Sequence, residues 1–188
     1  MQEIVTMEQQ FLLWIQDYVR CGMLTPLMKG ITTLGNAGMI WIILSAAMLA
    51  RKKTRKTGIT AVVALLLSLL VNNLILKNAV ARIRPYDAVQ ALQPLVARPS
   101  DFSFPSGHTA SSFAAAAVFF RELPRRWGVL FLILASLIAV SRLYVGVHYP
   151  TDVIFGMISG ILLGFTAEKL VILAEKKIRI SGKKATTE

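Results

Sequence analysis

The chain has 188 residues, of which 55% are hydrophobic and only 16% charged, against about 25% charged residues in typical soluble domains. This length fits a single domain over residues 1–188. The net charge of +11 suggests nucleic-acid binding, but 14 of the 21 Lys and Arg stand at the ends of apolar segments without interleaved aromatic residues. That placement argues against nucleic acid as a partner and indicates a protein built into a lipid bilayer.

The first predicted element is an amphipathic helix over residues 4–20. Its apolar side chains recur at helical spacing with polar side chains between them, which is the pattern of a helix lying flat at a membrane interface. A helix that simply packs on its neighbours shows the same pattern, so both interpretations stay open.

Five apolar segments follow, and about 20 helical residues suffice to cross a hydrocarbon layer of roughly 30 Å. They cover residues 29–50, 57–77, 105–120, 127–147 and 151–170. The third segment is short, so we expect part of it to border a polar cavity. The predicted fold is all-α, a polytopic membrane helix bundle with five to six transmembrane helices. The sixth would require residues 11–28 to cross.

The last apolar segment contains three glycines at a spacing of four residues, Gly156, Gly160 and Gly164. Small residues at this spacing let a neighbouring helix approach closely. We interpret them as packing within the bundle, with homodimerisation as the weaker alternative, and the oligomeric state stays open. The tail that follows, residues 182–188, is expected to be disordered.

Basic residues predict the orientation of the bundle, because cytoplasmic loops of membrane proteins carry an excess of Lys and Arg. Loops 51–56 and 121–126, together with residues 168–188, hold 14 basic and four acidic residues, a net charge of +10, whereas the rest of the chain carries +1. We therefore expect a multi-pass protein of the cell membrane with a cytoplasmic C-terminus. Segments 78–104 and 146–150 are then extracytoplasmic.

Ionisable side chains gather at the predicted outer boundary of the membrane. The only two histidines of the chain, His108 and His148, both lie there. Such residues are functional candidates, because burying a charge that has no role is costly. Singly, each has an ordinary explanation: Lys77 as a snorkelling side chain, for example, and Asp152 as the cap of the last helix. Their joint arrangement is more specific.

Three sequence blocks contain these residues. Lys77 is followed after six residues by Arg84-Pro85, then comes Pro105-Ser106-Gly107-His108, and finally Ser141-Arg142 is followed after five residues by His148 and after three more by Asp152. In this order the blocks resemble the signature of the type 2 phosphatidic acid phosphatase family, which shares its core with vanadium haloperoxidases. Every motif position matches, and the resemblance covers residues 57–165. It implies a membrane-embedded lipid phosphatase.

The chemistry of phosphoryl transfer explains the residue types in these blocks. A phosphoryl group in transfer spreads negative charge over its oxygens, so catalysis needs fixed cations and backbone donors. Lys77, Arg84 and Arg142 supply three cations, and the guanidinium fork suits two phosphate oxygens at once. Ser106 and Gly107 precede a predicted helix, so their N–H groups are expected to bind an anion at its positive end. We expect no metal and no cofactor.

The two histidines divide the work, as the resemblance implies. His148 and Asp152 are four residues apart, so on a helical turn the carboxylate reaches one ring nitrogen and leaves the other free to attack phosphorus. His108 is expected to protonate the leaving oxygen and then to activate the water that hydrolyses the phosphohistidine.

Residues beside the three blocks have weaker assignments. Arg82 either adds to the phosphate site or faces lipid headgroups. Asn72 and Asn73 are expected to make interhelical hydrogen bonds, and Tyr144 and Tyr149 suit an interfacial aromatic position.

The resemblance to small bacterial enzymes of this kind makes undecaprenyl diphosphate the favoured substrate, followed by phosphatidylglycerophosphate or phosphatidate. Such a lipid, anchored in the outer leaflet, would reach an extracytoplasmic active site by lateral diffusion. Two alternatives stay open: a lipid phosphotransferase of the same family and, from a different class, an anion transporter. The ionisable residues gather at one face and not at mid-membrane, which argues against the transporter.

Overall fold

The structure is a computed structural model that describes the backbone of residues 2–185 and the side chains of residues 3–180. Every regular element in this range is helical, which confirms the predicted all-α class. The elements are α1 (Gln2–Trp14), η1 (Ile15–Val19), α2 (Leu24–Leu34), η2 (Asn36–Gly38), α3 (Met39–Leu49), α4 (Arg55–Ser68), η3 (Leu69–Leu76), α5 (Lys77–Val80), α6 (Pro85–Ala88), α7 (Gly107–Glu122), α8 (Arg125–Tyr144) and α9 (Pro150–Ala185). The label η marks short π-helical or 3-10 stretches.

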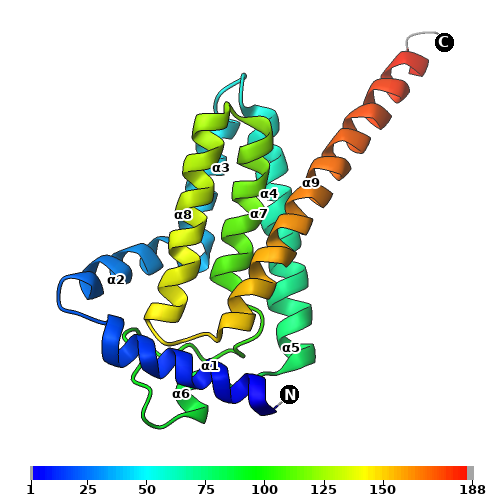
Figure 1. Cartoon of the computed structure of the whole chain (residues 1–188). Helices are drawn as coiled ribbons and strands as arrows, with labels where there is room; N and C mark the ends of the chain where they lie inside the picture. The colour runs from blue at the N-terminus through cyan, green and yellow to red at the C-terminus, as the bar shows by residue number, and fades with distance from the viewer. Residues whose placement is uncertain (1, 186–188) are drawn as a thin grey trace.

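Helix α7 forms the core of the bundle and packs against α4, α8 and α9 (Figure 1). Its buried surface is rich in small side chains, among them the run Ala114–Ala117. Small side chains let two helices approach closely, and a Cβ added at Gly160 of α9 would lie only 2.4 Å from the carbonyl oxygen of Ala110. This approach confirms that the glycine repeat of α9 packs within the bundle.

Three helical stretches among the described residues are long and apolar enough to cross a membrane, Arg55–Ala88, Arg125–Tyr144 and Pro150–Ile180. Helices α2 and α3 make a fourth only if they are taken together, because they meet at an angle of 48°. Helix α7 has 16 residues, which at about 1.5 Å per residue is shorter than the hydrocarbon layer. The third predicted segment is therefore short in the structure too.

The first predicted span, residues 29–50, is bent and not straight. Ala37 and Gly38 have positive φ angles of 51° and 70°, and a left-handed backbone cannot continue a right-handed helix. The bend turns α2 out of line with α3 (Figure 1), and α2 then packs against the lower part of α8. Apolar periodicity could not reveal it, because the segment is apolar on both sides of the break.

Helix α1 lies across one end of the bundle (Figure 1). Leu12 and Ile15, the first residue of η1, are buried, whereas Met7, Phe11 and Trp14 are exposed. The helix thus packs on the bundle with one face, as the packing interpretation predicts, and presents apolar side chains outward. Its position at a membrane interface stays a prediction. The helix is interrupted at residues 20–23, and residues 11–28 are not one continuous helix.

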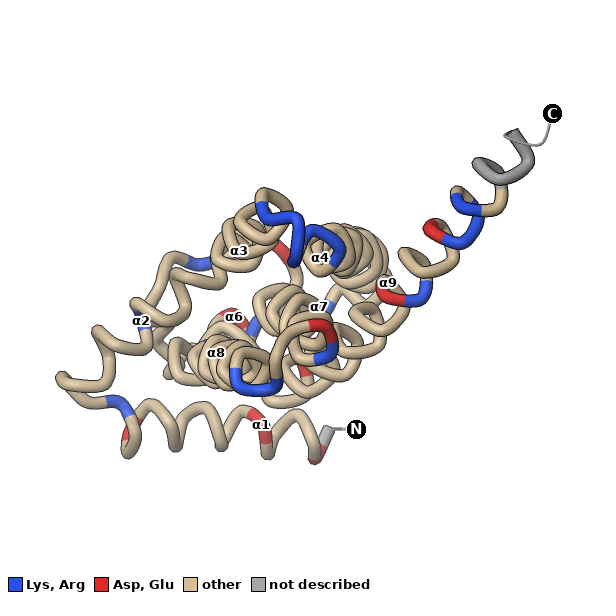
Figure 2. Tube along the Cα trace, turned by 90° about the horizontal axis from the view of Figure 1, so that it is seen from above, with Lys and Arg blue, Asp and Glu red and all other residues tan. Residues whose placement is uncertain are grey.

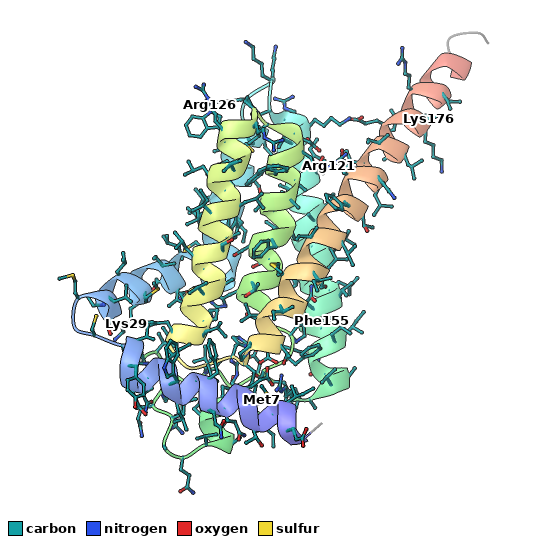
Figure 3. All side chains as sticks on the ribbon, in the orientation of Figure 1. Met7, Lys29, Arg121, Arg126, Phe155 and Lys176 are labelled. Carbon is teal, nitrogen blue, oxygen red and sulfur yellow. The ribbon has the colours of Figure 1, made fainter. Side chains whose placement is uncertain are left out.

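Basic residues gather at the opposite end of the bundle. Figure 2 shows Lys and Arg positions on the loops that join α3 to α4 and α7 to α8, and on the outer part of α9. Figure 3 places Arg121, Arg126 and Lys176 at this end and Met7 and Lys29 at the other. The basic segments of the sequence therefore lie together at one end of the folded bundle.

Helix α9 extends beyond the rest of the bundle toward the C-terminus (Figure 1). The tail expected to be disordered, residues 182–188, begins within it: residues 182–185 have helical backbone, and residues 186–188 lie outside the described part of the chain.

Candidate active site

A cavity of about 660 Å³ lies between α3, α4 and the ends of α7 and α8. Six of the eight predicted site residues line it, namely Lys77, Arg84, Gly107, His108, Arg142 and His148. Much of the remaining lining is apolar and comes from α3, α4 and η3, including Ile42, Val62, Leu65, Leu66 and Leu69. The three sequence blocks therefore meet at one cavity that is cationic in one part and apolar in another.

His148 lies in the short loop between α8 and α9, where Gly146 turns the chain with a φ of 76°. Its Nε2 lies 3.4 Å from Nη1 of Arg84 and so faces the cations. Its Nδ1 lies 3.5 Å from Oδ2 of Asp152, which is longer than an ordinary hydrogen bond. Burial lowers the pKa of His148 to about 3. At neutral pH the ring is uncharged and keeps a lone pair for attack.

Asp152 stands behind His148, fully buried at the start of α9, and does not line the cavity. Its Oδ2 accepts hydrogen bonds from Oγ of Ser103 at 2.5 Å and from the N–H of Tyr149 at 2.9 Å. Its Oδ1 accepts one from Nη1 of Arg82 at 2.7 Å. A carboxylate held on both oxygens keeps a set direction toward its histidine, as an orienting group requires.

His108 occupies the first turn of α7, and its Nε2 lies 2.9 Å from Oδ1 of Asn36. When Nε2 donates to this oxygen, the ring lone pair is on Nδ1. Asn36 of η2 thus positions the second histidine. Sequence reasoning missed Asn36, although its place between Gly35 and Gly38 in an apolar segment was an available signal.

The three predicted cations are buried at the cavity wall. Lys77 forms an ion pair with Asp101, and Arg84 donates to the carboxylate of Asp101 at 2.6 Å and to its carbonyl oxygen at 2.8 Å. Arg142 donates to Oγ1 of Thr32 at 2.6 Å, while its buried Nε has no hydrogen-bond partner in the described part of the chain. A buried guanidinium donor without a partner at a cavity wall is suited to an anion.

Asp101, in the loop between α6 and α7, was not singled out from the sequence. Burial opposes its ionisation, but the hydrogen bond and charge of Lys77, and then those of Arg84, lower the pKa of Asp101 below its usual value. A phosphate entering the cavity therefore meets a negative group that already contacts two of the cations. Its proximity to the second block was the only signal in the sequence.

The N–H groups of Ser106 and Gly107 were both expected to bind an anion, but the structure places only one of these residues at the cavity. Ser106 is buried, and its N–H donates to the carbonyl oxygen of Asp152 at 3.1 Å, so it is not available to an anion in this structure. Gly107 does line the cavity, and a Cβ there would lie 3.0 Å from Oδ1 of Asn73. Ser106 thus joins the start of α7 to the start of α9, and Gly107 is the backbone position next to the cations.

Of the predictions made for residues beside the three blocks, the structure confirms some and not others. Asn72 makes the expected interhelical bond, because its Oδ1 accepts from a serine hydroxyl of α9 at 2.7 Å. Asn73, for which the same role was expected, lines the cavity instead. Tyr144 and Tyr149 are buried and do not line it. Arg82 is also absent from the lining.

The positive charge of the cavity comes from side chains. Among the described residues, no group of three or more His, Cys, Asp and Glu is placed to hold a metal ion. Independence from metal ions stays a prediction.

In a comparison with known protein families, residues 57–173 match the PAP2 superfamily, and this range contains all three blocks. The undecaprenyl-diphosphatase of Sulfolobus acidocaldarius is 32% identical over 154 residues, which are 82% of this chain and 74% of that protein. The lipid A 4'-phosphatase of Porphyromonas gingivalis is 30% identical over 171 residues, 83% of this chain and 71% of that protein. The crystal structure of a transmembrane PAP2-type phosphatidylglycerolphosphate phosphatase from Bacillus subtilis has a TM-score of 0.74 at 28% identity, and the match covers 90% of this chain and 87% of that one.

Proposed function

The chain belongs to the PAP2 superfamily and is a membrane phosphatase. We propose that it hydrolyses the terminal phosphate of a lipid phosphate or diphosphate, and that the reaction passes through a phosphohistidine on His148. One observation carries the proposal. Two histidines and three cations from separate blocks converge on a cavity whose remaining walls are largely apolar. The cations suit a phosphate, and the apolar walls suit the chain that bears it.

The reaction runs in two displacements. In the first, His108 is an imidazolium with protons on both ring nitrogens. Nε2 of His148 attacks phosphorus, the bond from phosphorus to the lipid oxygen breaks, and His108 donates its Nδ1 proton to that oxygen. In the second, His108 takes a proton from water, the water oxygen attacks phosphorus, and the phosphorus–nitrogen bond breaks, which releases phosphate and restores His148. Lys77, Arg84 and Arg142 stabilise the charge on the equatorial oxygens in both steps.

The apolar part of the cavity supports a lipid substrate that enters from the side. Ile42, Leu66 and Leu69 line the cavity and about half of each side chain is exposed, as suits a wall that a hydrocarbon chain would contact. The similarity to an undecaprenyl-diphosphatase favours undecaprenyl diphosphate. Phosphatidylglycerophosphate or phosphatidate comes next.

The active site belongs on the extracytoplasmic face in this proposal, and the C-terminus in the cytoplasm. The basic loops lie at one end of the bundle (Figures 2 and 3), and His148 lies in the loop at the opposite end of α8. Because excess Lys and Arg mark the cytoplasmic side, the cavity then faces the outer leaflet.

Phosphate release by the purified protein in detergent tests the proposal. The panel contains undecaprenyl diphosphate, phosphatidylglycerophosphate, phosphatidate and a water-soluble phosphomonoester. We expect release from the lipids, with the highest kcat/KM for undecaprenyl diphosphate and no loss in the presence of a strong chelator. His148→Ala and His108→Ala should each abolish turnover while the protein stays folded.

Three outcomes would contradict the proposal. Turnover by His148→Ala would exclude the phosphohistidine, and loss on chelation with recovery on adding magnesium would exclude a metal-independent site. Transfer of labelled phosphate to a second lipid, without release of inorganic phosphate, would identify a phosphotransferase instead.

A further inference from the structure

Arg82 lies at a junction that the two displacements do not use. Its Nη1 donates to Oδ1 of Asp152 at 2.7 Å and to Oγ1 of Thr151 at 2.8 Å, and its Nη2 donates to Oε2 of Glu8 at 2.5 Å. Its guanidinium lies over the ring of Tyr149, 3.9 Å from the ring centre. Because Arg82 does not line the cavity, these contacts do not place it on the transferring phosphate.

Glu8 is buried on α1, a helix whose other face exposes apolar side chains. Its Oε1 accepts hydrogen bonds from the N–H and the hydroxyl of Thr151, at 2.8 Å and 2.6 Å. A buried carboxylate is costly unless it is paired. Glu8 therefore stays in place through Arg82 and the first turn of α9, where a helix N-terminus favours negative charge.

We infer that Arg82 and Glu8 are positioning residues of the reaction: they fix the carboxylate of Asp152 that orients His148, and so make the N-terminal helix part of the active site. The inference rests on the proposed function, because it requires His148 to be the nucleophile. Glu8 lies outside the range that matches the family, residues 57–173.

The two oxygens of Asp152 have different partners. Oδ2 faces Nδ1 of His148, whereas Oδ1 is held, among the described residues, by Arg82 alone. Without that bond only the hydrogen bonds from Ser103 and from the N–H of Tyr149 to Oδ2 would resist rotation about the Cβ–Cγ bond. The ring would then be directed less firmly toward phosphorus. A misplacement of about 1 Å can cost on the order of 10²-fold in rate.

Glu8 also adjusts the charge behind the nucleophile. Arg82 shares one positive charge between two carboxylates, so Glu8, Arg82 and Asp152 together carry one net negative charge. That charge stabilises the positive charge that develops on His148 during its phosphorylation. Replacing Glu8 by glutamine leaves Arg82 to neutralise Asp152 fully, which should slow this step.

The test measures kcat and KM for phosphate release from undecaprenyl diphosphate, and inhibition by inorganic phosphate, in Arg82→Gln, Arg82→Lys and Glu8→Gln. We expect Arg82→Gln to lower kcat by about 10- to 100-fold, up to the loss that a misplacement of about 1 Å causes. Arg82→Lys should recover part of this loss, since it keeps the charge but not the fork, and Glu8→Gln should lose about threefold to tenfold. KM and the phosphate inhibition constant should stay within about twofold, because the cavity cations are unchanged.

The matched control is Arg121→Gln, which removes an arginine–glutamate pair of the same kind, with Glu168, at the other end of the bundle. It should leave kcat unchanged. The double variant Glu8→Gln/Arg82→Gln should be no slower than Arg82→Gln alone, because Glu8 acts through Arg82.

A folded Arg82→Gln protein with wild-type kcat would overturn the inference, as would a loss confined to KM, which would mean that Arg82 binds substrate. If Arg82→Gln fails to fold, Glu8→Gln decides, since it preserves the size of the side chain. A wild-type protein that releases no phosphate from any lipid would refute the proposed function, whereas an active wild type matched by both single variants would refute this inference alone.

Discussion

At the scale of single residues, one carboxylate already pairs with two of the cavity cations that we propose bind the substrate. Asp101 contacts both Lys77 and Arg84, and its side chain is half exposed, unlike the buried cations. A phosphate that binds these cations must displace Asp101 or share them with it. We therefore expect Asp101 to weaken phosphate binding and, by the same competition, to favour release of the product.

We predict that Asp101→Asn increases the affinity of the cavity for phosphate. The neutral amide competes less well for Lys77 and Arg84, so inorganic phosphate should inhibit at a severalfold lower concentration, and KM should fall. Asp87→Asn is the control, because Asp87 is exposed to a similar extent and its ion pair with Arg98 is 4.0 Å long. Weaker inhibition in Asp101→Asn would show instead that Asp101 holds the cations in their binding positions.

The low pKa of His148 predicts how stability depends on pH. The pKa of His148 is about 3 in the folded protein, against about 6.5 in an unfolded chain. Between these values the unfolded state binds the proton and the folded state does not, so this group makes stability fall as pH drops from 6.5 toward 3. Above pH 6.5 it contributes no pH dependence.

Thermal unfolding of the detergent-solubilised protein at pH 7.5 and pH 4.5 checks this prediction. The fall in Tm between the two values should be smaller for His148→Gln, which cannot titrate, than for the wild type. An equal fall in both proteins would show that His148 is not the group that takes up the proton.

At the scale of elements, the break between α2 and α3 positions His108. The bend brings Asn36 to the ring, and Gly35 lies so close that a Cβ there would be 2.8 Å from Cδ2 of His108 and 2.9 Å from Cγ2 of Ile138. Glycine is therefore required at this position, because His108 of α7 and Ile138 of α8 leave no room for a Cβ. The bend in the first span serves the active site.

We predict that Gly35→Ala destabilises the fold by about 1–3 kcal/mol, the usual cost of overpacking, and lowers kcat because His108 must shift. Gly30→Ala is the matched control: it lies within α2, the helix that ends just before Gly35, and its added Cβ would meet nothing within 4 Å. Gly30→Ala should be neutral or stabilising by up to about 1 kcal/mol. Equal effects of the two substitutions on Tm and kcat would argue against the close approach.

At the scale of the whole molecule, the two ends of the bundle differ in charge and in function. The basic end is joined by the ion pairs of Lys56 with Glu175 and of Arg121 with Glu168, and the other end holds α1 and the loop with His148. An enzyme with this arrangement would take its substrate from the outer leaflet and release phosphate away from the cytoplasm.

Cysteine labelling in intact cells tests this orientation in a Cys21→Ser background, because Cys21 is exposed. Ala97→Cys, in the exposed loop before α7, should react with a membrane-impermeant thiol reagent, and Lys53→Cys, in the exposed loop before α4, should react only after permeabilisation. The opposite pattern would invert the orientation and place the active site in the cytoplasm.

The sequence by itself determined the class of the fold, the family and five of the six ionisable residues that line the cavity, all but Asp101. Apolar segments of spanning length, separated by basic loops, leave few structures other than a membrane helix bundle. The blocks could be recognised because the residues within each block are close in the sequence: His148 and Asp152 lie four residues apart, and Lys77 and Arg84 seven. Residues separated by so few positions must also lie near one another in the folded protein, so their grouping can be predicted before the structure is known.

Only the tertiary structure decided how these groups are held. Asp101 reaches Lys77 across 24 residues, Asn36 reaches His108 across 72, and Glu8 reaches Arg82 across 74. No helical period relates such positions, because their separation depends on how loops close and on how close the helices pack. The bend at Gly38 and the use of the Ser106 N–H by Asp152 escaped prediction for the same reason: each follows from the approach of two segments whose individual sequences do not encode it.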